Sequence, residues 1–201
     1  MFLKKYIKKV LVALITPAVD DIKIKDRKEE LSFMTQLKKC GQRLEVGSSC
    51  RILCPEYISI GDFCRFGYNC RIEAIGEYNG TVFSPELIIG DHVSFEDNCH
   101  VGCLKSVVIE DGTMIASGVF ITDHFHGKIT SNDLLLRPEL RELSGKPVHI
   151  GKNVWIGEHV SIMPGVTLGN NVIIGANSVV THCFGENVVI AGCPARIIKE
   201  L

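Results

Sequence analysis

Residues 148–182 decide the fold, and they read VHIGKNVWIGEHVSIMPGVTLGNNVIIGANSVVTH. An apolar residue recurs at every sixth position, and a second small residue stands two positions before each of them. The two sets are Ile150, Ile156, Ile162, Leu168, Ile174 and Val180, and Val148, Val154, Val160, Val166, Val172 and Ser178. A period of six is neither the 3.6-residue period of an α-helix nor the two-residue period of a strand. It indicates a parallel β-helix in which each side of a triangular coil is one six-residue repeat.

The same repeat occurs twice more upstream. Its apolar positions are Val46 and Ile52, then Ile60, Phe66 and Ile72 in one run, and Ile89, Phe95 and Val101, then Ile109, Ile115 and Ile121 in the other. Asparagine recurs at the expected corners, where left-handed backbone angles are needed: Asn69, Asn98, Asn153, Asn170 and Asn177. A sandwich of ordinary short strands is the alternative, but strand alternation alone does not maintain a strict six-residue phase.

Composition is that of one globular domain in a chain of 201 residues, with 46% apolar and 22% charged residues. The net charge of −1 gives no indication of a nucleic-acid partner. Four of the nine cysteines occupy positions where valine stands in later repeats: Cys50, Cys64, Cys70 and Cys99. We expect these to be buried, reduced thiols, which fits a cytoplasmic protein. No CxxC pair is present, which disfavours a zinc site.

The first 43 residues differ from the repeats and are predicted to be a helical segment, with the β-helix domain at 44–201. Residues 1–16 have the pattern of a basic amphipathic helix that ends at Pro17. It packs on the coil or a neighbouring subunit, or it contacts a membrane surface peripherally. A signal peptide is disfavoured, because the apolar run is short and no small-residue cleavage site follows. A second short helix is predicted over Lys28–Lys39.

Two insertions interrupt the repeats, at Glu73–Glu86 and at His124–Pro147. The second is predicted to be a long loop over residues 124–147 that protrudes from a coil corner directly after Ile121. Excursions from a regular repeat array are where functional residues tend to lie.

Several motifs accompany the repeats: Ile121-Thr-Asp-His-Phe-His-Gly, Val154-Trp-Ile-Gly-Glu-His, Pro164-Gly-Val-Thr-Leu-Gly, Ile174-Gly-Ala-Asn-Ser-Val-Val-Thr and Ala191-Gly-Cys-Pro-Ala-Arg. With them, residues 44–201 resemble the hexapeptide-repeat acyltransferases, and most of all the bacterial sugar and polysaccharide O-acetyltransferases. The resemblance implies an all-β solenoid, a left-handed parallel β-helix. It also implies an acyl-CoA donor and a homotrimer with active sites between subunits. We expect N-terminal helices, the long loop and a short C-terminal helix to complete the fold.

His124 is the candidate catalytic residue. Transfer of an acyl group from a thioester to a hydroxyl needs a base for the hydroxyl proton, and histidine titrates near neutral pH. The resemblance implies this role for His124. Asp123 is its neighbour in sequence, but at a strand end its side chain is expected to point away, so no carboxylate partner of His124 is identified.

The resemblance also implies contacts with acetyl-CoA, which is a co-substrate and not a permanently bound cofactor. Trp155 is expected to line the pantetheine groove, Glu158 to offer a backbone N–H, and Ala176 to bond pantetheine amides through its backbone. The remaining candidates are Thr181, His182, Arg196 and Lys199, the last two for the 3′-phosphate.

The sequence specifies the residues that bind the acceptor less well than those that bind acetyl-CoA. Asn98 and Glu96 fall in a region where relatives bind the acceptor sugar, and His126 and Arg141 lie in the long loop. A zinc hydratase on the same fold needs converging histidines, two of them five residues apart, and no histidine pair here has that spacing. No metal site is therefore expected.

The function expected from these features is an acetyl-CoA-dependent O-acetyltransferase that acts on a sugar hydroxyl, in capsule, lipopolysaccharide or other glycan synthesis. The alternatives are acetyl transfer to an amino sugar, to serine or to a xenobiotic. A non-catalytic β-helix scaffold is an alternative of a different class.

Overall fold

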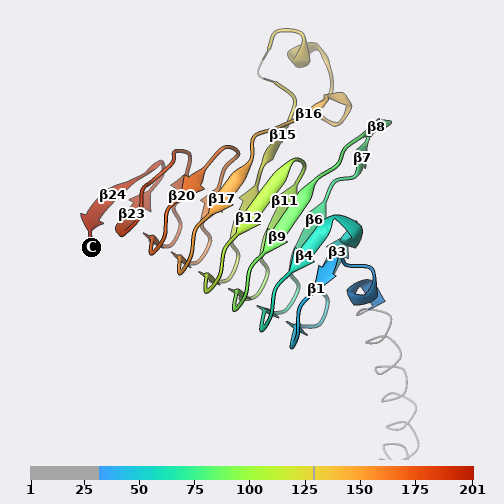
Figure 1. Ribbon diagram of the computed structural model, residues 1–201. Helices are drawn as coiled ribbons and strands as arrows, with labels where there is room; N and C mark the ends of the chain where they lie inside the picture. The colour runs from blue at the N-terminus through green and yellow to red at the C-terminus, as the bar shows by residue number, and fades with distance from the viewer. Residues whose placement is uncertain (1–31, 129) are drawn as a thin grey trace, which may run out of the picture. The chain divides into compact units, whose positions relative to one another are not determined.

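The computed structural model describes residues 32–128 and 130–201, and residues 33–201 form one compact unit. Short strands wind into a three-sided coil, and each turn of the coil adds one strand to each of three sheets (Figure 1). The first sheet contains β1 (Lys39–Cys40), β4 (Ile58–Ile60), β9 (Glu86–Ile89), β12 (Ser106–Ile109), β17 (Val148–Ile150) and β20 (Thr167–Leu168). All neighbouring strands in it are parallel.

The second sheet contains β2 (Glu45–Val46), β5 (Arg65–Phe66), β10 (Ser94–Phe95), β13 (Met114–Ile115), β18 (Trp155–Ile156), β21 (Ile173–Ile174), β23 (Val188–Gly192) and β24 (Ala195–Glu200). The third contains β3 (Arg51–Leu53), β6 (Arg71–Ala74), β11 (His100–Cys103), β14 (Phe120–Thr122), β19 (Ser161–Ile162) and β22 (Val179–Val180). The helical elements of the described part are short 3-10 turns: η1 (Ser32–Thr35), η2 (Pro55–Tyr57), η3 (Asp133–Leu135) and η4 (Pro138–Leu140).

The strand register places the six-residue repeat in the core. In the third sheet, Ile72, Val101, Ile121, Ile162 and Val180 are paired in successive coils. None of these side chains is measurably exposed. Burial of stacked aliphatic side chains is the main favourable term in folding. The sequence prediction of a parallel, six-residue repeat is therefore confirmed.

The corners agree with the sequence prediction except at one position. Asn69, Asn98, Asn153 and Asn177 have positive φ angles between 54° and 60°. At the remaining corner Asn171, and not Asn170, has a positive φ angle. The Asn170 side chain instead accepts a hydrogen bond from the Lys152 backbone N–H at 2.8 Å. Either residue of an Asn-Asn pair can adopt the left-handed angle, so the sequence alone could not choose between them.

The nine cysteines all lie within the described residues as thiols, and the four at valine-type positions are buried as predicted. Cys64 and Cys99 donate to backbone carbonyl oxygens of the next coil, those of Gly90 and Ala116. Burial, reinforced by the charge of Asp123, raises the pKa of the Cys103 thiol to about 12. Such a thiol stays protonated at neutral pH and is a poor nucleophile.

The two ends of the chain require corrections. The predicted C-terminal helix is wrong: β24 pairs antiparallel with β23 and covers the last strand of the second sheet. Consecutive β-branched residues, such as Ile197-Ile198, favour strand, and a second strand satisfies an otherwise open sheet edge. At the other end, β1 lies inside the segment predicted to be helical, so between 32 and 43 that prediction holds only for η1.

The predicted basic helix over residues 1–16 lies outside the described residues, as does the start of the Lys28–Lys39 helix. In the described part of the chain, no helix has the length and apolar character needed to cross a membrane.

Both insertions form antiparallel hairpins on the same side of the coil (Figure 1). The first is β7 (Glu77–Tyr78) with β8 (Thr81–Val82). The second is β15 (His124–His126) with β16 (Leu143–Gly145), which closes the base of the long loop. The hairpins are connected, because the Tyr78 hydroxyl and the Asn79 amide both donate to the backbone carbonyl of Glu139 at 2.8 Å. The loop therefore leaves the coil in a fixed direction at the corner that contains His124.

Candidate active site

Asp123 fixes the corner where the long loop begins. Its side chain is completely buried, and its two oxygens accept hydrogen bonds from the backbone N–H groups of Leu104, Lys105 and Ser106 at 2.7, 2.6 and 2.9 Å. Its own carbonyl accepts from the backbone N–H of Lys146, at the end of the loop. A buried carboxylate with several N–H donors is well satisfied, so Asp123 ties together the previous coil and both ends of the loop.

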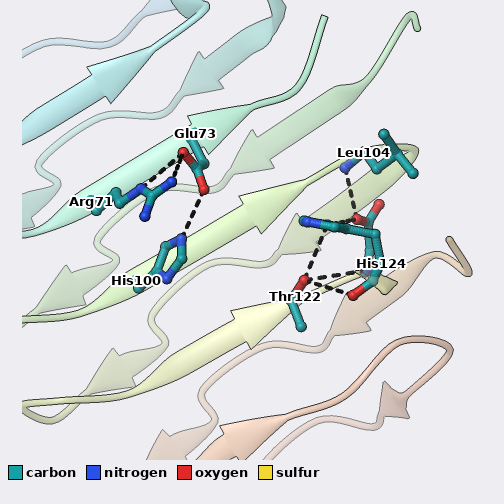
Figure 2. A network of polar contacts seen from close by, with 7 residues as sticks. Arg71, Glu73, His100, Leu104, Thr122 and His124 are labelled. Atoms are coloured by element: carbon teal, nitrogen blue, oxygen red, sulfur yellow. Dashed lines mark hydrogen bonds and ion pairs between the residues drawn. The ribbon is translucent and has the colours of Figure 1, made fainter. Parts of the chain in front are cut away.

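His124 is oriented by this carboxylate. Its Nδ1 lies 3.1 Å from Asp123 Oδ1 and 3.1 Å from Thr122 Oγ1, and its side chain is only 13% exposed. Figure 2 shows the His124 side chain beside that of Thr122. An ionised carboxylate can only accept, so Nδ1 carries the proton and the lone pair lies on Nε2. His124 is thus arranged as a base whose reactive nitrogen is Nε2.

The expectation that Asp123 points away from His124 is wrong. The chain bends at Asp123, between β14 and β15, and does not continue as an extended strand. The alternation of side chains along a strand therefore stops at Thr122, and consecutive side chains can meet at the bend.

A second carboxylate, missed in the sequence, lies near the His124 ring. Glu73 is 8% exposed and pairs with Gly102 of the next coil, which in turn pairs with Thr122. A Cβ atom placed on Gly102 would be 3.0 Å from His124 Cε1 and 3.8 Å from Glu73 Oε1. The two groups are 51 positions apart in sequence, so only the stacking register of the coils could have revealed that they are neighbours.

The loop residues predicted to bind the acceptor lie beside this corner. His126 Nδ1 is 3.2 Å from the Tyr78 hydroxyl, and its ring centroid is 6.5 Å from that of His124. Arg141 donates from Nε to the Leu136 carbonyl at 3.1 Å. A pocket of about 340 Å³ inside the loop is lined by Phe125, His126, Gly127, Lys128, Asp133, Leu134, Arg141 and Ser144. The structure therefore brings His126 close to His124 and leaves Arg141 in the loop.

The residues predicted to hold pantetheine lie on another side of the coil. Trp155 is in the second sheet, is 49% exposed, and stands between Met114 and Ile173 in the register. Glu158 and Ala176 are exposed at the corner that follows, where the Asn177 N–H donates to the Glu158 carbonyl. His124 follows the third sheet, so the structure of one chain does not bring these residues to it.

The other predicted contacts are also dispersed. Thr181 and His182 follow β22 and are joined by a 2.8 Å hydrogen bond, and Arg196 and Lys199 are exposed on β24. Asn98 accepts from the Asn69 side chain at 2.9 Å, and Glu96 forms an ion pair with Arg65. Both lie between the second and third sheets, one corner before that of His124. Within residues 32–128 and 130–201, no His, Cys, Asp and Glu side chains form a group of three suited to a metal ion.

A parallel three-sided coil of six-residue repeats is the fold expected of a hexapeptide-repeat transferase. A family model described as bacterial transferase hexapeptide (six repeats) matches residues 147–182. A protein of Escherichia coli (strain K12), named as the lipopolysaccharide biosynthesis O-acetyl transferase WbbJ, is 41% identical over 163 residues. The alignment covers 76% of this chain and 80% of that protein. The chain belongs to the hexapeptide-repeat transferases, and the resemblance seen in its motifs is confirmed.

Solved structures agree on the fold. A maltose O-acetyltransferase from Clostridium difficile 630 is 28% identical, with a TM-score of 0.58 over 87% of this chain and 75% of that one. A variant of the Bacillus cereus N-acyltransferase AntD, in complex with coenzyme A and dTDP-4-amino-4,6-dideoxyglucose, has a TM-score of 0.68 at 22% identity, over 86% and 88% of the two chains. The second similarity concerns the fold alone.

Proposed function

We propose that this enzyme transfers the acetyl group of acetyl-CoA to a hydroxyl of a sugar in the synthesis of lipopolysaccharide or a related glycan, with His124 as the general base. The observation that carries the proposal is the fixed His124 ring: buried Asp123 holds Nδ1, and Nε2 keeps its lone pair. The 41% identity to a protein named as a lipopolysaccharide O-acetyl transferase supports the choice of acceptor.

The reaction needs one proton carrier and no covalent enzyme intermediate. His124 Nε2 takes the hydroxyl proton as the sugar oxygen attacks the thioester carbonyl. The tetrahedral intermediate then breaks its C–S bond, and the CoA thiolate takes the proton back from the imidazolium. The products are the sugar acetate and CoA with a free thiol, and the imidazole is regenerated. Asp123 stabilises the imidazolium formed between the two steps.

The acceptor is tested by measuring CoA thiol release from acetyl-CoA with a panel of methyl glycosides, amino sugars, serine and chloramphenicol. We expect the methyl glycosides to give the highest kcat/KM. Faster transfer to an amine acceptor would show that the reaction is N-acetylation and not O-acetylation. Absence of acetyl-CoA binding would favour the scaffold alternative.

The acetyl-CoA site is proposed to lie between subunits of a homotrimer of left-handed coils. In this proposal one subunit binds acetyl-CoA and presents the thioester to His124 of another subunit. The residues of the first subunit that contact acetyl-CoA are Trp155, Glu158, Ala176, Thr181, His182, Arg196 and Lys199. Support comes from the separation of His124 and Trp155 on different sides of the chain and from the half-exposed indole, whose burial against pantetheine or a neighbour would be favourable.

One chain has a mass of 22.2 kDa. Light scattering at micromolar concentration is expected to give three times that mass. Trp155→Ala should raise the KM for acetyl-CoA and leave the KM for the acceptor unchanged. A monomeric mass in an active preparation would contradict the shared site.

A further inference from the structure

Beside His124 lies a cluster formed by Glu73, Arg71 and His100. Its charged carboxylate, that of Glu73, takes no part in the proton transfer by His124. Glu73 Oε1 lies 3.0 Å from His100 Nε2, and Oε2 accepts from Arg71 Nε and Nη2 at 2.9 and 2.7 Å (Figure 2). Burial opposes ionisation of Glu73, but the hydrogen bonds from His100 and Arg71 outweigh it and lower the pKa of the carboxyl. Glu73 is therefore a fixed negative charge at neutral pH.

The absence of a side chain at Gly102 leaves open the space between this charge and His124. The Glu73 carboxylate, the Thr122 hydroxyl and the His124 ring all lie within 4 Å of the point where a Cβ of residue 102 would be. The side chains of Glu73 and His124 remain 10% and 13% exposed. Two polar groups with different roles thus converge on one small space on the outer face of the third sheet.

We propose that Glu73 binds the acceptor sugar, accepting a hydrogen bond from a hydroxyl adjacent to the one that His124 deprotonates. This inference rests on the proposed function. Adjacent hydroxyls of a sugar ring are close together, so one can face His124 Nε2 while the other faces Glu73 Oε1. A carboxylate held by Arg71 and His100 keeps its geometry in the empty site, which reduces the entropic cost of binding. The site then selects acceptors with a pair of neighbouring hydroxyls. It disfavours acceptors that carry an anionic group next to the acetylated hydroxyl, because that group would face the Glu73 carboxylate.

Gly102 leaves the space that the acceptor would occupy between Glu73 and His124. Alanine at this position would place a methyl group 3.0 Å from His124 Cε1, closer than most real carbon contacts, and 3.8 Å from Glu73 Oε1. It would occupy the space between the two groups without altering either of them chemically.

The test compares wild type with Glu73→Gln, using acetyl-CoA and the methyl glycosides of glucose, galactose and mannose with their monodeoxy analogues. Glu73→Gln should raise the acceptor KM by about 10- to 100-fold, the loss expected for one hydrogen bond to a charged group, with kcat and the KM for acetyl-CoA almost unchanged. With wild type, the deoxy analogue lacking the adjacent hydroxyl should have an acceptor KM raised by a similar factor. With Glu73→Gln, the KM of this analogue should rise little further.

A matched control is Glu110→Gln, because Glu110 also accepts from a histidine Nε2, that of His149 at 2.8 Å, but on the first sheet. It should leave both KM values unchanged. Gly102→Ala, which keeps Glu73, should also raise the acceptor KM and provides a second variant if Glu73→Gln unfolds at the assay temperature.

Three outcomes would overturn the assignment. One is an unchanged acceptor KM in both variants. Another is a fall in kcat alone, which would make Glu73 an electrostatic partner of His124. The third is a lower melting temperature with no change in the kinetics of the folded variants, which would make the cluster purely structural. If wild type acetylates none of the glycosides, the proposed function itself fails and the assignment of Glu73 fails with it.

Discussion

His124→Ala is expected to lower kcat by about 10²–10⁴-fold, the usual contribution of a positioned general base. The KM for acetyl-CoA should change little, because the imidazole acts on the acceptor hydroxyl. The fold should persist, since the ring makes its polar contacts through Nδ1, to Asp123 and Thr122, and Asp123 keeps its three backbone donors in the variant. Steady-state kinetics with saturating acetyl-CoA measure the effect.

His149→Ala is the matched control, because His149 is also a coil histidine paired with a carboxylate, and it lies on the first sheet. It should retain wild-type turnover. Near-wild-type kcat in His124→Ala would remove His124 from the mechanism.

Asp123→Asn is expected to damage both stability and catalysis. An amide has one acceptor oxygen where the carboxylate has two, so its NH₂ group would face at least one backbone N–H that Asp123 now satisfies. Since the site is fully buried, we expect the free energy of unfolding to fall by ~3 kcal/mol. The amide can also donate to Nδ1, which would move the histidine proton to Nε2 and produce a tautomer that is not a base there. We expect kcat to fall by ~10²-fold or more through this effect.

Asp111→Asn separates these effects from the general loss of a carboxylate. Asp111 also accepts a backbone N–H, that of Asp91 at 3.0 Å, but it is exposed and its ion-pair partner Lys152 is exposed too. Its substitution should change the unfolding free energy by less than ~1 kcal/mol and leave kcat unchanged. Denaturant titration gives the first quantity. Wild-type stability and turnover in Asp123→Asn would show that the carboxylate neither anchors the loop nor orients the histidine.

The core of the fold was predictable because each turn of the coil uses the same inward positions. A single run such as Ile150, Ile156 and Ile162 therefore carries the whole pattern, and a few mismatches do not hide it. The C-terminal strand was not predictable in this way, since β24 follows the last repeat and pairs antiparallel with β23. The pair Ile197-Ile198 favours a strand, but so short a signal does not decide the conformation, which also depends on the sheet edge beside it.

The site was predictable only in part, for a related reason. His124 was singled out by the family resemblance of its motif and by its place where the repeat ends after Ile121 and a polar loop begins, and its catalytic role stays a prediction. The contact with Asp123 depends on a bend whose angle no periodicity specifies, and the approach of Glu73 depends on which residues of separate coils lie in register across Gly102. Trp155 is half exposed on the second sheet, and its contact with pantetheine stays a prediction, because the proposed arrangement of subunits cannot be seen in one chain.

Acetyl transfer to a sugar oxygen is tested most directly by identifying the product. Full-length enzyme is incubated with acetyl-CoA carrying ¹³C in the acetyl group and with the methyl glycoside that gives the fastest CoA release, and the product is examined by mass spectrometry and NMR. We expect one labelled acetate ester on a ring hydroxyl that has a neighbouring hydroxyl, formed by wild type and almost absent with His124→Ala. CoA release without label on the sugar, or equal labelling by both enzymes, would contradict it.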